Sequence, residues 1–243
     1  MPRWLGEIYA KVYVEFGLEL FTLKEAISHL RIPQNRMMVA WSKLHSLGAV
    51  TVFRRSRPRL YRLQDPGNLM MLFSGRVRKL EIEQEAYAKL VYDAFRETQK
   101  ILETTSLALY GSVARGTAGA ESDIDLLIIS DELSGSIVSR IDDLIPIEER
   151  LKGELAWLRH HGIHTSLAFY PLRRKEAEKL PILFLDLVDE VVIIQDQDRF
   201  LERLLDQLKG RLATLGARKV VLEDGSWYWD LKPDYRPLEV IKL

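Results

Sequence analysis

Apolar residues recur at helical spacing in the first thirty residues. One such stripe consists of Leu5, Ile8, Tyr9 and Val12. It predicts a helix over 3–16. Thr22 followed by Glu25 has the spacing of a capping box and predicts a second helix that ends near Leu30. Pro33 supports this end, because the residue before a proline avoids the helical region.

A third helix and a charged β-hairpin are predicted next. The helix covers 34–47, and Gly48 is expected to cap it. Its predicted apolar face consists of Met37, Met38, Trp41, Leu44 and Leu47. Residues 49–53 and 60–63 read as two strands joined by the basic loop 54–59. The pattern therefore predicts three helices followed by a hairpin.

The rest of the chain alternates between helical and strand patterns. Residues 65–68 are interpreted as a turn cluster at a domain boundary. Two apolar runs, 107–110 and 126–129, predict strands that are buried on both faces. Helices are predicted over 75–103, 133–157 and 173–180, strands over 162–170 and 191–194, and a further helix along the apolar stripe of 200–215. We expect that last stripe to dock on the core, and a dimer seam is the alternative.

Charge is distributed unevenly, although the chain of 243 residues has a net charge of zero. Residues 1–80 carry 14 Lys and Arg against 5 Asp and Glu, so the remainder is acidic. This asymmetry indicates that the N-terminal part meets a polyanion. The chain has no cysteine, no N-terminal signal pattern and only short apolar runs. We therefore expect a cytoplasmic protein that does not span a membrane.

Two short motifs between the predicted buried strands carry the chemistry. Gly111 and Ser112 follow the first strand directly, and after ten intervening residues come Asp123, Ile124 and Asp125. Residues two apart in a strand point the same way, so the two carboxylates aim at one point. Repelling carboxylates are usually compensated by a divalent ion, and oxygen ligands suit Mg²⁺. A glycine and a serine at a helix start suit phosphate, so the pair of motifs indicates a nucleoside triphosphate with its metal.

These residues resemble the signature of the DNA polymerase beta-like nucleotidyltransferase superfamily, in particular its minimal nucleotidyltransferase branch. The resemblance rests on the stretches 111–116 and 122–126 and covers roughly 74–196. It implies that Asp123 and Asp125 are catalytic metal ligands. It also implies that the nucleotide is bound by Gly111, Ser112, Arg115 and Ser122. Members use two Mg²⁺ or Mn²⁺ ions to transfer a nucleoside monophosphate to a hydroxyl.

The resemblance also implies a third carboxylate on a neighbouring strand, which this chain lacks. The candidate strand, 162–170, contains no Asp or Glu and offers Thr165 or Ser166 beside His164. Three alternatives stay open. The chain is a weak or single-metal transferase, recruits an acid such as Glu121, or binds nucleotide without catalysis.

The three helices and basic hairpin resemble a winged helix-turn-helix. The resemblance implies that the third helix reads a DNA groove and that the hairpin contacts phosphates. The expected DNA-binding residues are Gln34, Asn35, Arg36 and Lys43 of the helix and Arg54, Arg55, Arg57 and Arg59 of the hairpin. Four arginines in six residues fit phosphate contacts. Docking onto another protein is the alternative.

The expected fold is α+β, similar to that of archaeal members. A winged helix over 1–66 precedes a nucleotidyltransferase domain over 70–196, a mixed sheet flanked by helices, and a C-terminal helix and aromatic tail over 197–243. The tail, 224–235, is expected to fasten to the core or to stack a base. The expected partners are a nucleoside triphosphate and DNA, and a homodimer is left open. The function is nucleotidyl transfer, with two alternatives: a DNA-binding regulator that senses nucleotide or is inactive, and an antitoxin-like enzyme that modifies a protein.

Overall fold

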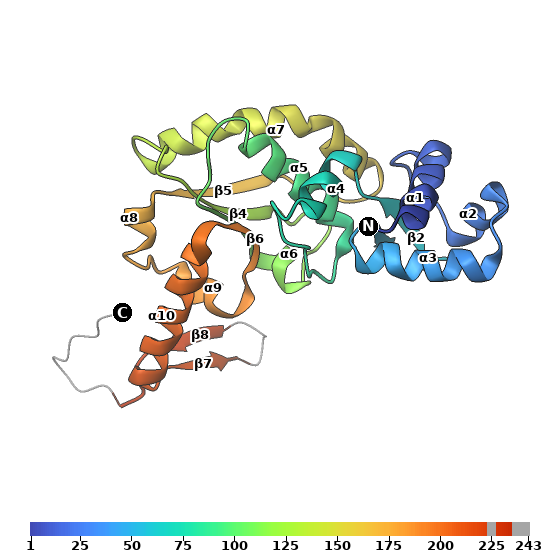
Figure 1. The fold of residues 1–243 in the computed structure, drawn as a ribbon. Helices are drawn as coiled ribbons and strands as arrows, with labels where there is room; N and C mark the ends of the chain where they lie inside the picture. Colours follow the sequence, from blue (N-terminus) through green and yellow to red (C-terminus); the bar gives the residue numbers. More distant parts are fainter. Residues whose placement is uncertain (223–226, 235–243) are drawn as a thin grey trace.

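The N-terminal end of the molecule consists of three helices and a two-stranded ribbon. The structure is a computed structural model that describes residues 1–222 and 227–234 (Figure 1). The N-terminal elements are α1 (Arg3–Phe16), α2 (Leu23–Leu30), α3 (Gln34–Ser46), β1 (Val50–Arg54) and β2 (Leu60–Leu63). The predicted capping box is present, because Glu25 N donates to Thr22 Oγ1 at 3.2 Å and Thr22 N donates to Glu25 Oε2 at 2.7 Å. The predicted helix bounds in this part are therefore confirmed to within a residue.

One residue of the predicted apolar face of α3 points outward. Met37, Trp41 and Leu44 are buried, whereas Met38 is 51% exposed. Successive residues in a helix are rotated by about 100°, so Met38 lies well off the stripe formed by its neighbours. The placement of Met38 in the core was wrong.

The segment after the ribbon is not the turn that the sequence suggested. Asp65 caps a helix, α4 (Pro66–Phe73), and its Oδ1 accepts from Gly67 N at 2.8 Å. Pro66 stands at the first helical position, where a missing N–H costs nothing. The Asp-Pro-Gly-Asn cluster therefore begins a helix.

The helix predicted over 75–103 is much shorter in the structure. After a stretch without helix come a short 3₁₀ helix, η1 (Glu85–Tyr87), and α5 (Ala88–Thr98). Tyr92 Oη on α5 accepts from Leu80 N at 2.8 Å and donates to Arg78 O at 3.1 Å, and Arg78 N donates to Ile194 O. Backbone groups that a helix would pair internally are thus bonded to other elements, so this segment is not helical.

A four-stranded mixed sheet forms the centre of the larger part. Its strands are β3 (Ser106–Tyr110), β4 (Ile124–Ile129), β5 (Leu167–Leu172) and β6 (Val192–Asp196), in the order β5-β4-β3-β6. β4 and β5 are parallel, and the other two pairings are antiparallel.

Helices cover both faces of the sheet (Figure 1). Alternate residues of β4 divide between two cores: Leu126 and Ile128 pack with α5 and α7 (Ile137–His160), whereas Leu127 and Ile129 pack with α9 (Phe184–Glu190) and α10 (Phe200–Leu215). Asp125 has the same parity as Leu127, so it lies on the α9 and α10 face of the sheet.

Three predicted elements around β5 differ from the structure. β5 covers Leu167–Leu172 instead of 162–170 and includes Pro171, which an edge strand tolerates because its outer N–H groups need no partner. The helix predicted over 173–180 is only α8 (Arg174–Ala177), and α9 was not predicted. α7 begins at Ile137, later than the predicted 133, because Ser136 Oγ caps it by accepting from Ser139 N at 3.2 Å.

The C-terminal helix docks on the core, as predicted. The buried side chains of α10 are Phe200, Leu201, Leu204, Leu205, Leu208 and Leu212. A hairpin of β7 (Arg218–Val221) and β8 (Trp227–Asp230) follows, and Trp229 Nε1 donates to Leu185 O at 3.1 Å. Trp229 thus fastens the tail to α9, while residues 224–226 and Tyr235 of the predicted tail lie outside the described residues.

None of the helices in the described ranges combines the length and apolarity that crossing a membrane requires.

Candidate active site

Gly111 sits in close contact with Asp125. β3 ends at Tyr110, which pairs with Asp125 on β4, and α6 (Gly111–Arg115) begins at the next residue. Gly111 has φ +72°, and a Cβ there would lie 2.0 Å from Asp125 Oδ2. No side chain fits this backbone conformation or this space, so the turn requires glycine. The turn places Ser112 and the start of α6 beside the Asp125 carboxylate.

Asp123 and Asp125 occupy the beginning of β4. Asp123 is exposed and accepts from Ser166 Oγ at 2.6 Å, whereas Asp125 is partly buried. Burial raises the pKa of Asp125, and so does the charge of Asp123, against a smaller opposing effect of Arg115. The charge of Asp123 thus acts on Asp125, and in the described part of the chain no ion pair joins either carboxylate to a cation. A divalent ion relieves such repulsion.

The strand beside β4 carries no acid at the matching positions. Ala168 pairs with Asp125 in the parallel register, and Ser166 precedes the strand and bonds Asp123. His164 is exposed, and its backbone N–H donates to Ala120 O at 2.6 Å. Glu121 is exposed in the loop before β4. Within residues 1–222 and 227–234, no three His, Asp or Glu side chains lie close enough together to share one metal ion.

Ser122 and Arg115 have partners of their own. Ser122 Oγ accepts from Gly119 N at 2.9 Å, which orders the loop between α6 and β4. Arg115 Nη1 donates to Glu190 Oε2 on α9 at 3.1 Å. Arg115 therefore connects the end of α6 to α9, while its charge still acts on Asp125.

A family model described as "Nucleotidyltransferase domain" matches residues 89–183, which include Gly111, Ser112, Asp123 and Asp125. A putative protein adenylyltransferase of Methanocaldococcus jannaschii is 31% identical over 104 residues, which are 43% of this chain and 67% of the relative. The chain belongs to the nucleotidyltransferase domain family.

Two solved structures match part of this chain at low structural similarity. A toxin–antitoxin crystal structure with AMP-PNP is 14% identical, with a TM-score of 0.34, and the match covers 52% of this chain and 92% of that one. A mutant of the toxin–antitoxin MntA-HpeT is 10% identical, with the same TM-score and the same coverage of both chains.

Sequence reasoning missed the residues that α9 and the C-terminal hairpin bring to the nucleotidyltransferase site. Burial raises the pKa of Tyr110, and the charges of Asp125 and Asp186 raise it further, so its hydroxyl lies in the field of both carboxylates. Glu190 bonds Arg115, and Lys219 Nζ of β7 lies 2.6 Å from Glu190 Oε1. The apolar spacing within 184–188 is a signal for α9, but no local signal connects β7 with α6.

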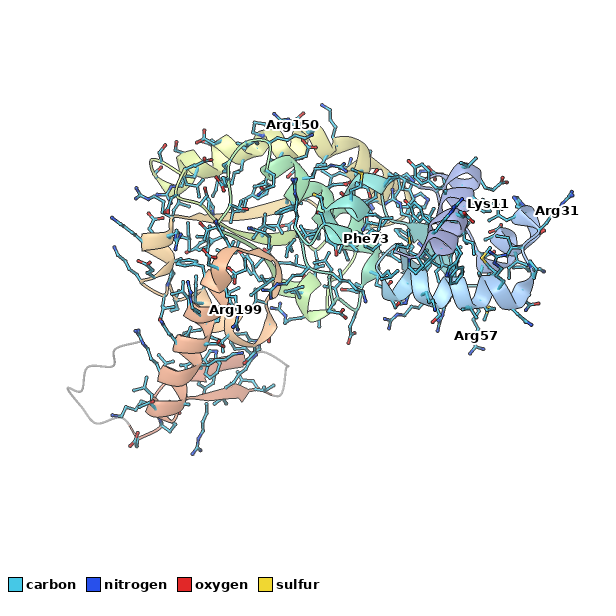
Figure 2. All side chains as sticks on the ribbon, in the orientation of Figure 1. Lys11, Arg31, Arg57, Phe73, Arg150 and Arg199 are labelled. Carbon is cyan, nitrogen blue, oxygen red and sulfur yellow. The ribbon has the colours of Figure 1, made fainter. Side chains whose placement is uncertain are left out.

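The residues predicted to bind DNA lie on α3 and at the β1–β2 turn. Those of α3 are exposed, namely Gln34, Asn35, Arg36 and Lys43. Two of the four hairpin arginines contact the nucleotidyltransferase part: Arg54 donates to His161 O and Arg55 to Glu83 O, each at 3.1 Å. Arg57 and Arg59 are exposed, and Figure 2 shows Arg57 projecting away from the body of the molecule.

Because the pKa of Asp125 is raised, replacing Asp125 by the neutral residue asparagine should increase the stability of the fold, and the increase should depend on pH. Ionising Asp125 disfavours the folded state, so its contribution to stability is present at low pH and is lost as pH rises through its folded pKa. Asp125→Asn should therefore raise the Tm at pH 8 in EDTA, and this gain should shrink toward pH 4. Asp142→Asn, an exposed carboxylate of α7, is the matched control and should show no such trend. A lower Tm of Asp125→Asn at pH 8 would show that the Asp125 carboxylate is stabilised by a partner.

Proposed function

We propose that the protein transfers a nucleoside monophosphate from a nucleoside triphosphate to an acceptor hydroxyl. One observation supports this most strongly: the Gly111 turn lies against Asp125, with space only for a hydrogen at its Cα. This contact supports a site in which the Gly111 turn holds phosphates beside the two carboxylates. Packing alone does not require strand and turn residues at the edge of a sheet to lie as close together as Gly111 and Asp125 do.

Each residue has a proposed role in this reaction. Gly111 and Ser112 hold the β- and γ-phosphates through backbone N–H groups and the serine hydroxyl. Ser166 holds the Asp123 carboxylate in place through its 2.6 Å hydrogen bond. Ser122 orders the loop that leads into Asp123, and Arg115 adds positive charge beside the triphosphate.

Mg²⁺ or Mn²⁺ fits the donor set of the site. Asp123 and Asp125 would hold the ion, because two carboxylates that repel one another suit a hard divalent cation. The bound ion supplies charge that orients the triphosphate and acidifies the acceptor hydroxyl. One ion matches the two carboxylates present, since β5 offers Ala168, preceded by Ser166, where a further acid would stand.

The acceptor is proposed to be a hydroxyl of a protein side chain. The relative from Methanocaldococcus jannaschii is described as a putative protein adenylyltransferase. The site also opens at the rim of the sheet, where Asp123 and Ser122 lie at the end of an exposed loop. A folded protein reaches such a rim more readily than an enclosed pocket.

A second proposed activity is DNA binding by the N-terminal part as a winged helix. The exposed polar face of α3 and the arginines at the ribbon tip, Arg57 and Arg59, support it. Arg54 and Arg55 fix the ribbon against the larger part, which leaves the tip to contact phosphates. A gel-shift titration should show affinity that falls steeply with salt, and salt-independent binding would contradict it.

The position of the radioactive label tests nucleotidyl transfer directly. With Mg²⁺ or Mn²⁺ and a cell extract as acceptor, [α-³²P]ATP should label an acceptor, whereas [γ-³²P]ATP should release labelled pyrophosphate and label nothing. This result separates transfer of AMP from transfer of phosphate. Label from the γ-position alone would contradict nucleotidyl transfer. Binding of ATP without any label transfer would support a nucleotide-sensing regulator instead.

A further inference from the structure

The C-terminal hairpin lies next to the proposed nucleotide site, although it is outside the region that matches the family model, 89–183. Trp229 Nε1 bonds Leu185 O of α9 at 3.1 Å, and Trp229 and Leu231 pack against the core on that side of the sheet. Figure 1 shows β7 and β8 beside α10 on the side of the molecule that carries α9. The hairpin is therefore held in place by contacts that do not involve charge.

Glu190 binds two cations from separate elements. Its carboxylate accepts from Lys219 Nζ of β7 at 2.6 Å and from Arg115 Nη1 of α6 at 3.1 Å. Burial raises the pKa of Glu190, but the hydrogen bonds from Lys219 and Arg115 outweigh it and leave the pKa lowered. Lys219 Nζ also lies 4.0 Å from the centre of the Trp227 ring. Lys219 is thus held over an aromatic surface, with its ammonium group bonded to Glu190 on α9.

The same two cations act on the carboxylates of the site. Burial and the charge of Asp123 raise the pKa of Asp125, and burial and the charge of Glu190 raise the pKa of Asp186. Arg115 opposes both shifts, and Lys219 opposes the shift of Asp186. Lys219 is therefore linked to Asp125 through Glu190 and Arg115. Trp229 fastens the hairpin to α9 by a contact that is separate from this charge pair.

We propose that Lys219 binds the triphosphate together with Arg115, and that Glu190 forms ion pairs with both side chains until the nucleotide binds. This inference rests on the proposed function and adds a residue from the C-terminal hairpin to its binding site. A triphosphate carries more negative charge than one carboxylate, so it competes with Glu190 for the two cations. The prediction is opposite for the two residues: losing Lys219 weakens binding, and neutralising Glu190 strengthens it.

Equilibrium binding of ATP, ADP and AMP to the full-length chain with Mg²⁺ tests this inference. Lys219→Met should weaken ATP binding about tenfold and leave AMP binding nearly unchanged, because AMP lacks the outer phosphates. Lys219→Arg should restore most of the affinity. Glu190→Gln should strengthen ATP binding about threefold, and adding Lys219→Met should remove this gain. Lys209→Met, an exposed lysine of α10, is the control and should change nothing.

A purely structural ion pair gives the opposite result for Glu190. In that case Glu190→Gln leaves ATP affinity unchanged or lowers it in parallel with Lys219→Met, and the inference is overturned. Should Lys219→Met fail to fold, the ATP affinities of Glu190→Gln and Lys219→Arg test the inference without it. Wild-type ATP binding with no effect of Lys219 overturns the inference and leaves the proposed function standing. ATP binding that depends on Lys219, without transfer of label, supports the inference and contradicts the transferase. A wild-type chain that binds no ATP contradicts both.

Discussion

Replacing both Asp123 and Asp125 by Asn should abolish label transfer, with a loss of at least about a thousandfold in rate. The two carboxylates are the proposed ligands of the divalent cation, and removing a metal's ligands removes several kcal/mol of transition-state stabilisation. The amide has nearly the same shape as the carboxylate, so the Gly111 contact is kept. Metal-dependent binding of the triphosphate should be lost together with the transfer.

Stability measurements separate this loss from unfolding. Because burial and Asp123 raise the pKa of Asp125, the Asn variants should be at least as stable as the wild type near neutral pH. Asp142→Asn on the opposite face of the sheet is the matched control and should keep full activity. Transfer that persists in the double variant would remove the metal-binding role from these two residues.

Replacing Arg62 by Met should lower the free energy of unfolding by about 3–5 kcal/mol, because it removes two charged hydrogen bonds from the buried Glu154 carboxylate and leaves it only the pairing with Lys89 among the described residues. The Arg62 side chain is 4% exposed and that of Glu154 on α7 is 8% exposed. Both Arg62 Nη atoms donate to Glu154, and Arg62 Nε donates to Leu18 O at 2.7 Å. Its guanidinium lies 3.4 Å from the centre of the Trp157 ring. This residue therefore joins the N-terminal ribbon to the nucleotidyltransferase part.

Urea titration at pH 7 measures this effect. Arg59→Met at the exposed ribbon tip is the control and should change stability by less than about 0.5 kcal/mol. Arg62→Met combined with Glu154→Leu should recover much of the loss, because two apolar side chains then pack where a buried carboxylate would lack part of its pairing. Lys89 loses Glu154 in that double variant but keeps Asp93, to which it is bonded at 2.5 Å in the wild type. A loss below about 1 kcal/mol for Arg62→Met alone would contradict this account of the interface.

The accuracy of the sequence-based predictions depended on how local the determining contacts are. The N-terminal helices were predicted closely, because Thr22 and Glu25 bond each other within one turn. The prediction of one helix over 75–103 was wrong. The helical spacing of apolar residues is overridden by Tyr92, whose hydroxyl bonds backbone groups twelve and fourteen residues away. Long-range hydrogen bonds of this kind leave no periodic signal in the sequence.

The residues of the candidate site likewise fall into those that local spacing predicts and those that only long-range contacts bring in. Gly111 and Asp125 could be identified from spacing, because they lie on adjacent strand ends joined by a short loop. Lys219 and Glu190 could not, since Glu190 contacts Arg115 and Lys219 across separations of 75 and 29 residues along the chain. The absence of an acid on β5 is visible in the sequence, but only the register shows that Ala168 stands beside Asp125.

A crystal grown with Mn²⁺ and an ATP analogue carrying a methylene group between its α- and β-phosphates tests the central claim most directly. Anomalous scattering locates manganese independently of the protein model. The account predicts an ion bound by the carboxylates of Asp123 and Asp125, with the β- and γ-phosphates against Gly111 and Ser112. Nucleotide bound elsewhere, or phosphates at this turn with no manganese between the two aspartates, would contradict it.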